Sequence, residues 1–357
     1  VVTFPIMARF LGPEDFGVLS LYHATLAVCA MVAMLGLPHA FFRLYTERGD
    51  ADWASRTQSA VFWAMSIVSA GAVALLLIFG GPLNRLLGAA EGTDFVAPLC
   101  LATLATAFEA LASSRLQADG QRRQFLRLTV FQVAGSRLLP ATLVVLGFGV
   151  PGAVWGEAGS TALVAVVAGL FAFRDLRARA DGAMVRQALA YGGALTPGSL
   201  ASWVLRGTDK YMLRLLAADP LRVVGYYGVA ERVSGALHLV GQGALLGWRR
   251  FAFQNMHDEA NKPLLARGAP VLLVGMGYFA FALALLGEDL LYWLVGPSFL
   301  EAAPAIPILA AATLLSEAQS ILRIGLLREK RTGLVSAIAG GGALVNLALN
   351  LLAIPRY

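Results

Sequence analysis

The sequence predicts an all-α polytopic membrane protein, and two observations support this fold class. Hydrophobic residues make up 58% of the 357 residues and charged residues only 14%, whereas soluble domains are roughly a quarter charged. Apolar runs of about 20 residues, the length that crosses a bilayer core as a helix, fill the chain from end to end. Backbone groups in lipid require helices or a closed barrel, and these runs are too long and too continuously apolar for alternating barrel strands.

About eleven membrane-spanning helices are predicted from runs of this length. The sequence opens inside an apolar run and stops at the end of a span, so we expect both ends to be truncated. The predicted spans are residues 1–10 (partial), 17–40, 57–79, 95–114, 128–148, 151–173, 188–206, 223–247, 268–287, 303–325 and 333–354.

Basic residues gather in every second connection between the predicted spans. In the alternate connections, Gly149–Pro151 and Gly287–Ala302 have no Lys or Arg, and Gly80–Asp94 has only Arg85. Because basic loops of membrane proteins stay in the cytoplasm, this pattern places the N-terminus there. It also accounts for the pI of about 9.6 without nucleic-acid binding. The basic connections hold Arg43, Arg48, Arg56, Arg115, Arg122, Arg123, Arg127, Arg174, Arg177, Arg179, Arg186, Arg249, Arg250, Lys262, Arg267, Arg323, Arg328, Lys330 and Arg331.

One connection departs from this pattern. The stretch from Arg206 to Arg214, with Arg222 beyond it, falls on the predicted outer side and is nevertheless rich in cations. Two explanations are open. The boundary is misplaced, or the charges pair with Asp209 and Asp219 in the ordinary way; alternatively, some of these cations face a water-filled cavity.

The chain also repeats itself at a shift of 208 residues. Six predicted spans separate corresponding points, so the two halves have the same orientation and are parallel repeats about an axis along the membrane normal. This organisation predicts a two-lobed transporter with pseudo-symmetric six-helix bundles at residues 1–180 and 181–357, the second one incomplete, joined by a basic linker (Arg174–Arg186). The matches at this shift are Glu109 through Arg115 with Glu317 through Arg323, Leu87-Gly88 with Val295-Gly296, and Gly17 with Gly225.

Several segments, in this order, resemble a known family. They are Ala8-Arg-Phe-Leu-Gly-Pro-Glu-Asp-Phe-Gly-Val-Leu-Ser20, Gly36-Leu-Pro-His-Ala-Phe-Phe-Arg43, Tyr191-Gly-Gly-Ala-Leu-Thr-Pro197, Thr208-Asp209-Lys210-Tyr211, Val224-Gly-Tyr-Tyr-Gly-Val-Ala230 and Asn346-Leu-Ala-Leu-Asn350-Leu-Leu-Ala-Ile-Pro355-Arg-Tyr357. The chain resembles the oligosaccharide flippases (polysaccharide biosynthesis, Wzx-like proteins) of the multidrug/oligosaccharidyl-lipid/polysaccharide exporter superfamily. The resemblance implies two six-helix bundles, as in multidrug (MATE-type) exporters, and alternating access. It also implies isoprenoid-diphosphate-linked glycans as substrates.

Ionisable residues inside the spans are the candidate functional residues, because burying them in lipid is costly. Arg137 lies in the middle of a span, and with Arg206 and Lys210 it is predicted to line a cavity between the lobes. An anionic diphosphate needs always-protonated donors, which arginine supplies as a fork. Three further arginines near cytoplasmic helix ends are either positive-inside anchors or part of the cavity mouth. They are Arg43, Arg115 and Arg323.

Carboxylates are the candidates for ion coupling. Glu157, Glu231 and Asp209 are in this group, whereas Glu109 and Glu317 are expected to be structural partners of other helices. The histidines in or near spans are expected to form hydrogen bonds between helices. The sequence shows no catalytic constellation and no metal-ligand cluster, and Cys29 and Cys100 are predicted to be inert. We therefore expect no enzyme and no cofactor, while coupling to H⁺ or Na⁺ stays open.

The sequence therefore predicts a flippase that moves isoprenoid-diphosphate-linked oligosaccharide across the bacterial inner membrane for surface polysaccharide or O-antigen (lipopolysaccharide) biosynthesis. Expected partners are lipid-linked oligosaccharide, membrane lipids and other polysaccharide-assembly membrane proteins, and no nucleic acid. A multidrug cation antiporter is the alternative in the same superfamily. An integral-membrane glycan polymerase or transferase is the alternative in another class, although the short outer connections disfavour it.

Overall fold

In the computed structural model every regular element of the described residues is a helix, as the sequence predicts. The structure describes residues 3–47, 50–174, 176–177, 180–255, 262–328 and 332–354. Arg48, Arg179, Lys330, Arg331 and the terminal Pro355-Arg356-Tyr357, all singled out from the sequence, lie outside these ranges. The elements are α1 (Thr3–Phe10), α2 (Pro13–Met34), α3 (Leu37–Glu47), α4 (Ala51–Ile78), α5 (Gly80–Leu87), α6 (Val96–Ala118), α7 (Arg122–Leu143), η1 (Val144–Phe148), α8 (Gly149–Ala172), α9 (Gly182–Leu216), α10 (Pro220–Asn255), α11 (Lys262–Leu294), η3 (Pro297–Ala302), α12 (Ala305–Arg328) and α13 (Thr332–Ala353).

Six segments of the described residues are long and apolar enough to cross a membrane. This is fewer than the predicted eleven: α1 has only eight residues, the part of α13 that is counted, Gly340–Leu352, is shorter than a span, and two further reasons apply. The hairpin of α7 and α8 counts as one segment, because a short π-helical turn, η1, joins the two helices where Gly147 has φ 91°. In addition, α9 and α10 are 35 and 36 residues long but carry charged residues along their length. The prediction of a multi-pass α-helical membrane protein is confirmed.

The cation-rich outer connection arises because the predicted end of the helix at residue 206 is misplaced. The sequence places the end of a span at residue 206, but α9 continues to Leu216, so Arg206, Asp209 and Lys210 lie within a helix and the connection to α10 shrinks to residues 217–219. The charges do not end the helix because neighbouring helices compensate them. Lys210, for example, places its Nζ 2.7 Å from the Oε2 of Glu231 on α10.

The predicted span 17–40 is likewise two helices. Leu35 and Gly36 have positive φ values of 43° and 68°, which ends α2 in a left-handed turn and starts α3 in a new direction. Arg43 therefore lies on α3, which packs against α9 as well as against α4 and α6.

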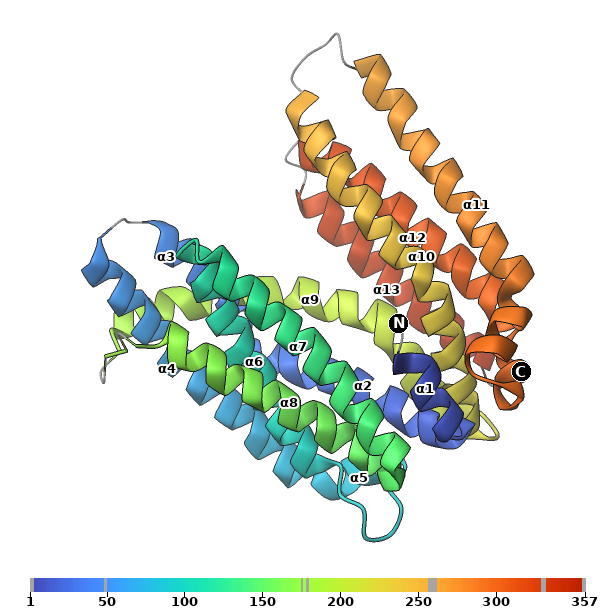
Figure 1. Cartoon of the computed structure of the whole chain (residues 1–357). Coiled ribbons are helices and arrows are strands. Elements are labelled where there is room, and N and C mark those ends of the chain that lie inside the picture. Colours follow the sequence, from blue (N-terminus) through green and yellow to red (C-terminus); the bar gives the residue numbers. More distant parts are fainter. Residues whose placement is uncertain are drawn as a thin grey trace.

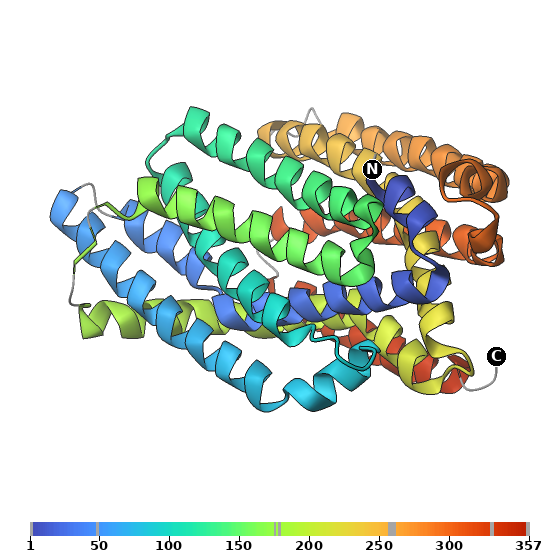
Figure 2. The ribbon, with the colours of Figure 1, turned by 60° about the horizontal axis from the view of Figure 1, so that its bottom comes forward.

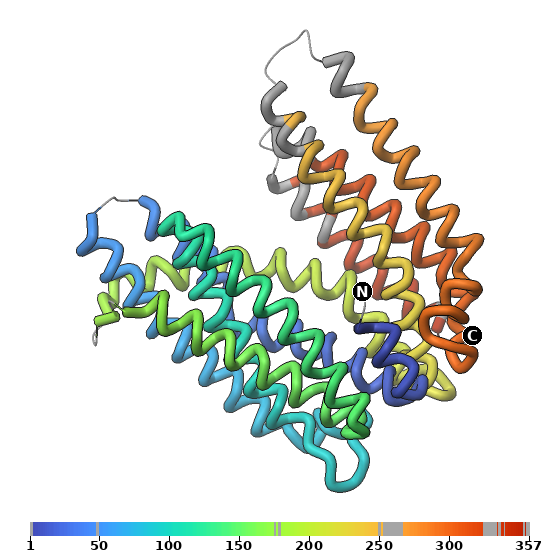
Figure 3. Tube along the Cα trace, viewed as in Figure 1, coloured from blue at the N-terminus to red at the C-terminus, as the bar shows by residue number. Residues whose placement is uncertain are grey.

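The helices form two groups that are arranged as a V (Figure 1). The N-terminal group comprises α2 to α8 and the C-terminal group α10 to α13. The groups meet at the ends joined by the short connections and diverge at the ends that carry the basic connections. The tube view shows α1 between the two groups (Figure 3). In the turned view α9 runs along the N-terminal group and reaches the C-terminal group (Figure 2), packing against α3 and α4 as well as α10 and α13.

The basic linker is fastened to the end of the N-terminal group by ion pairs. Asp181 caps α9 by accepting a hydrogen bond from the backbone N–H of Ala183, and Arg56 of α4 pairs with its carboxylate. The Arg56 guanidinium and this cap hold the pKa of Asp181 below its usual range. Arg177 of the linker donates to Asp52 at 2.6 Å. The first turns of α9 are thereby held against the N-terminal group.

The two groups touch most closely where α2 crosses α10. A Cβ atom built on Gly17 would lie 2.0 Å from the carbonyl oxygen of Leu221, and one built on Gly225 would lie 1.9 Å from that of Pro13. Only glycine allows the two backbones to approach this closely. Gly17 and Gly225 stand 208 positions apart, which is the shift found in the sequence. Residues on either side of the crossing also interlock, since Phe16 of α2 packs edge-on against Phe299 of η3 at 5.9 Å.

We predict that Gly17→Ala weakens this crossing. The added methyl group overlaps the α10 backbone, and such overpacking costs about 1–3 kcal/mol, so the thermal unfolding midpoint of the detergent-purified chain should fall by several degrees. Gly71→Ala is the matched control, because no atom of a neighbouring residue lies within 4 Å of a Cβ built at that helical glycine. Equal midpoints for the two variants would show that the crossing tolerates a side chain and is not a tight contact.

Candidate functional site

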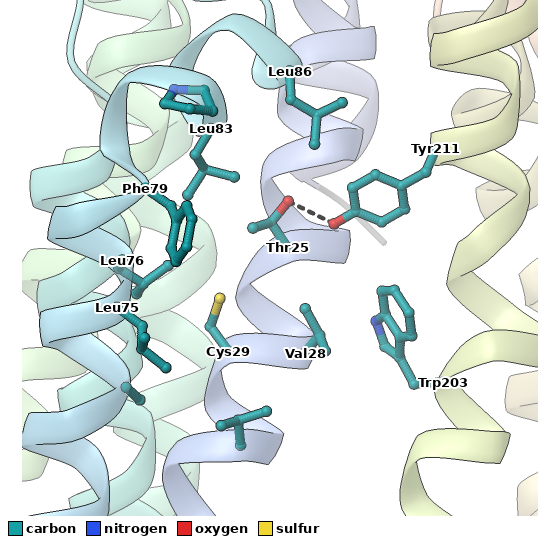
Figure 4. Close-up of a pocket in the computed structure, with 13 residues that line it drawn as sticks. Thr25, Val28, Cys29, Leu75, Leu76, Phe79, Leu83, Leu86, Trp203 and Tyr211 are labelled. Atoms are coloured by element: carbon teal, nitrogen blue, oxygen red, sulfur yellow. Dashed lines mark hydrogen bonds between the residues drawn. The ribbon is translucent and has the colours of Figure 1, made fainter.

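Two of the cavities differ in chemistry, and one of them lies between the helix groups. The first, which we call the arginine cavity, has a volume of about 670 Å³ and is bounded by α1, α7, α10 and α11, with Arg137 and Arg232 in its wall. The second, the apolar groove, has a volume of about 510 Å³ between α2, α4, α5 and α9 (Figure 4). Its polar groups pair with each other, since Thr25 Oγ1 and the hydroxyl of Tyr211 lie 2.7 Å apart.

The cavities stand in corresponding places along the two halves of the sequence. Six residues that line the groove each have a counterpart 208 positions away that lines the arginine cavity. The pairs are Thr25 and Val233, Val28 and Ala236, Leu75 and Leu283, Pro82 and Leu290, Leu86 and Leu294, and Tyr211 and Thr3. Related positions thus surround one cavity that contains two arginines and one groove whose lining residues include no charged side chain.

At one end of the arginine cavity lies a small pocket of about 20 Å³, room for about one water molecule. Four ionisable side chains from four helices line it: His23 of α2, Arg137 of α7, Glu157 of α8 and Arg232 of α10. His23 Nε2 lies 2.7 Å from Glu157 Oε2, and Arg232 Nη2 lies 3.4 Å from His23 Nδ1. The Arg232 guanidinium also stacks on the ring of Phe16 at 4.5 Å.

These contacts define the protonation of His23. Arginine only donates hydrogen bonds and a carboxylate only accepts them. Both contacts are therefore satisfied by a neutral imidazole that carries its proton on Nε2, donates to Glu157, and accepts from Arg232 at Nδ1. In this state the pocket holds two guanidinium cations and one carboxylate, so one positive charge is in excess.

Arg137 is the cation without a fixed partner. It forms no hydrogen bond or ion pair with any described residue, and its side chain is exposed to the cavity that it lines. Arg232, in contrast, is held by His23 and by the Phe16 ring. A free guanidinium beside a fixed one, in a site with excess positive charge, can bind an anionic group with several oxygen atoms.

The carboxylates suggested for ion coupling each have a partner. Glu157 bonds to His23, and Glu231 forms an ion pair with Lys210. Asp209 accepts hydrogen bonds from the Tyr227 hydroxyl at 2.8 Å and from the Asn350 amide at 2.5 Å. Lys210 is therefore compensated too, and it lines neither of the two large cavities.

The remaining predicted cations lie away from the arginine cavity. Arg206 is exposed on α9, four residues before Lys210. Arg43 stacks on Tyr191 of α9 at 4.6 Å. Arg115 donates to Gln58 at 3.0 Å, pairs with Asp119, and lies over the Tyr45 ring, all within the N-terminal group. Arg323 is exposed on α12. The structure thus unites Arg137 with Glu157 but brings neither of them together with these four arginines.

Sequence reasoning omitted Arg232 and His23 from the site. Arg232 follows Glu231 directly, and their side chains point about 100° apart around the helix, so Glu231 faces α9 while Arg232 faces α2. The presence of an arginine well inside an apolar run was the available signal. Its partner could not be read from the chain, because His23 lies 209 residues away.

Comparisons with known proteins give a consistent assignment. The sequence model of a family described as "Polysaccharide biosynthesis protein" matches residues 6–239. The chain is 26% identical over 318 residues to the "Succinoglycan biosynthesis transport protein ExoT" of Rhizobium meliloti (strain 1021). That alignment covers 87% of this chain and 61% of the relative, so the chain spans about three fifths of the relative's length.

Solved structures share the fold. An inward-facing multidrug resistance MATE family transporter of the MOP superfamily superimposes with a TM-score of 0.71 at 13% identity, covering 99% of this chain and 94% of that one. An outward-facing MATE transporter of the same superfamily gives a TM-score of 0.52 at 14% identity over 98% and 93% of the two chains. The MATE-like fold expected from the sequence is therefore confirmed.

We predict that His23→Ala destabilises the chain by about 3 kcal/mol, because it leaves Glu157 partly buried without its partner. Thermal unfolding of the detergent-purified variant measures this loss. His39→Ala is the control, since His39 is exposed on α3, and it should unfold like the wild type. A wild-type midpoint for His23→Ala would show that the bond to Glu157 contributes nothing to the fold.

Proposed function

The chain belongs to the polysaccharide biosynthesis protein family, and on this premise we propose that it is a flippase for isoprenoid-diphosphate-linked oligosaccharide. The observation that carries the proposal is the arginine cavity, with its free Arg137 guanidinium and its excess positive charge inside a membrane protein. A cation there is costly in the empty site, and the diphosphate of a lipid-linked glycan would compensate it.

The two cavities suit the two ends of such a substrate. Guanidinium forks bind phosphate oxygens in pairs, so Arg137 and Arg232 would hold the diphosphate while it is away from bulk water. The isoprenoid chain needs only apolar surroundings, which the bilayer and the Leu and Val side chains of the cavity walls provide. No cofactor is required, because moving the substrate breaks no bond.

The V-shaped arrangement fits alternating access by two bundles, residues 1–180 and 181–357. We propose that the open ends, which carry the basic connections, face the cytoplasm of a bacterial cell and that the protein spans its inner membrane. Rocking about the crossing of α2 and α10 would then close these ends and separate the opposite ones. In this proposal Arg43, Arg115 and Arg323 lie nearer the cytoplasmic side than Arg137.

The alternatives fit the cavity less well. A multidrug antiporter for cations needs negative charge where its cargo binds, and the charge balance here is positive. A glycan polymerase or transferase needs catalytic groups on a substantial outer segment, whereas the connection between α9 and α10 has three residues, 217–219. We therefore propose a transporter rather than an enzyme, with lipid-linked oligosaccharide, membrane lipids and other polysaccharide-assembly proteins as partners.

The proposed orientation predicts opposite labelling of two exposed positions. In a background without Cys29 and Cys100, a membrane-impermeant thiol reagent should label Gln124→Cys, at the start of α7, only after the cytoplasmic side is opened. It should label Ser298→Cys, in η3, from outside intact cells. Labelling of Gln124→Cys from outside, or of Ser298→Cys only from inside, would reverse the orientation.

The proposed substrate site predicts that Arg137→Ala reduces transport at least tenfold, since a charge-assisted hydrogen bond contributes about 1.5–3 kcal/mol. The measurement is the rate at which labelled polyprenyl-diphosphate saccharide crosses the bilayer of vesicles that contain the full-length protein. Arg137→Lys should recover only part of this rate, because lysine donates from one point and not as a fork.

Arg123→Ala is the matched control for this measurement. Arg123 is exposed in the first turn of α7, far from the cavity on the same helix, and its variant should transport at the wild-type rate. A wild-type rate for Arg137→Ala would remove Arg137 from the mechanism.

A further inference from the structure

A second buried acid lies in the C-terminal group, outside the arginine cavity. Glu317 of α12 is 1% exposed, and its Oε1 lies 2.5 Å from Nδ1 of His238 on α10. Its other oxygen, Oε2, is buried and has no hydrogen-bond partner among the described residues. A buried carboxylate oxygen without a partner is costly, so this group differs from Glu157, Glu231 and Asp209, which all have partners.

The surroundings of Glu317 are apolar and close-fitting. Its carboxyl carbon would lie 2.8 Å from a Cβ built on Gly241 of α10, and the terminal carbon of Met276 on α11 would lie 2.6 Å from the same point. The absence of a side chain at Gly241 therefore makes the space that the carboxyl group occupies.

His238 is the titratable group that faces Glu317 within the described residues. Residues 268–287 of α11 include no charged residue, and their Tyr278 is 72% exposed. The sequence of α13 has no ionisable residue. On α12 itself, Arg323 is exposed six residues further along, on a different face. On α10, Glu231 and Arg232 lie about two turns away and are held by Lys210 and His23.

His238 connects this interior acid to the exterior of the helix group. Its side chain is 56% exposed, and at spacings of seven and four residues it shares a face of α10 with Glu231 and Gln242. Glu231 bonds to Lys210 of α9, so this face points toward α9. The first half of α9 leaves α10 and packs along α3 and α4, at the ends where the two groups diverge (Figure 1).

The pair has the chemistry of a site for one proton. With one shared proton it is either an imidazolium with a carboxylate or an imidazole with a carboxylic acid, and both forms are neutral overall. Removal of that proton leaves a negative charge among apolar side chains, which is costly. The contact between the two side chains therefore provides a place where one proton can be shared.

We propose that Glu317 and His238 form a proton-binding site that is loaded through His238 while α9 and α10 are apart. Proton binding as such is independent of any cargo. Its use to drive transport rests on the flippase function proposed above. When the two helix groups close at this end, α9 approaches the exposed face of His238 and separates the site from water, so the bound proton and the position of the groups depend on each other.

Infrared spectroscopy of the purified chain tests proton binding directly. A buried carboxylic acid gives a C=O band that should disappear when the proton is removed at higher pH, and this band should be absent from Glu317→Gln. Glu109→Gln is the matched control, because Glu109 stands at the related position of the first half and is partly exposed beside Ser113. The same band in Glu317→Gln as in the wild type would refute the site.

His238→Gln serves as a second variant, because a half-exposed side chain can be replaced without disturbing the core. It should keep the carboxylic acid band and shift the pH at which the band disappears. An unchanged pH dependence would refute the role of His238.

The dependence of the helix-group positions on proton binding is tested by a distance measurement. The distance is taken between spin labels at Gln124→Cys and Arg267→Cys, in a background without Cys29 and Cys100. This distance should change with pH in the wild type and in Glu109→Gln and stay constant in Glu317→Gln. If the distance does not change with pH in the wild type, proton binding does not move the helix groups. If the distance responds to Na⁺ at constant pH and Glu317→Gln abolishes that response, the ligand of the site is not the proton. These readouts need no saccharide, so a failed transport assay beside a positive result here rejects the flippase and not the proton site.

Discussion

The close crossing of α2 and α10 is the contact on which the two-group arrangement depends. Gly17 and Gly225 bring the two backbones together at the end where the groups meet, and further along the same helices the groups diverge. The two helices stay packed beyond the two glycines, because a Cβ built on Gly228 of α10 would lie 2.3 Å from Ser20 Oγ of α2. About two turns further along, His23 on α2 and Arg232 on α10 interact across the boundary at 3.4 Å.

The second constraint is the cost of charge inside a membrane, which explains why most intramembrane ionisable groups here are paired. Lys210 with Glu231, His23 with Glu157, and Asp209 with Tyr227 and Asn350 all join different helices. Such pairs stabilise the packing only while the helices keep their positions. Arg137 and one oxygen of Glu317 have no such partner among the described residues, and the functional proposals are built on these two groups.

Much of the fold could be predicted from the sequence, because apolar runs and basic connections report directly on bilayer crossing. The errors arose where local composition conflicted with tertiary contacts. Charges at Arg206, Asp209 and Lys210 suggested the end of a helix, but Asp209 and Lys210 have partners on α10 and α13 and α9 continues. The site was harder to predict. Arg137 is conspicuous in an apolar run, whereas the roles of His23 and Arg232 depend on a contact between residues 209 positions apart, which no local pattern encodes.

The repeat explains how one scaffold can hold two different cavities. Positions 208 residues apart surround the arginine cavity and the apolar groove, so the two lie at corresponding places in the sequence repeat. The chemistry differs because individual side chains differ: Arg232 corresponds to Ala24, and Glu231 corresponds to His23. At the first pair, Arg232 contributes a guanidinium to the arginine cavity, whereas Ala24 is buried and contributes no charge to the groove. At the second pair of positions each residue binds within its own half, His23 to Glu157 and Glu231 to Lys210. Under the proposed flippase function, this difference in charge would let the arginine cavity accept an anionic group while the groove stays apolar.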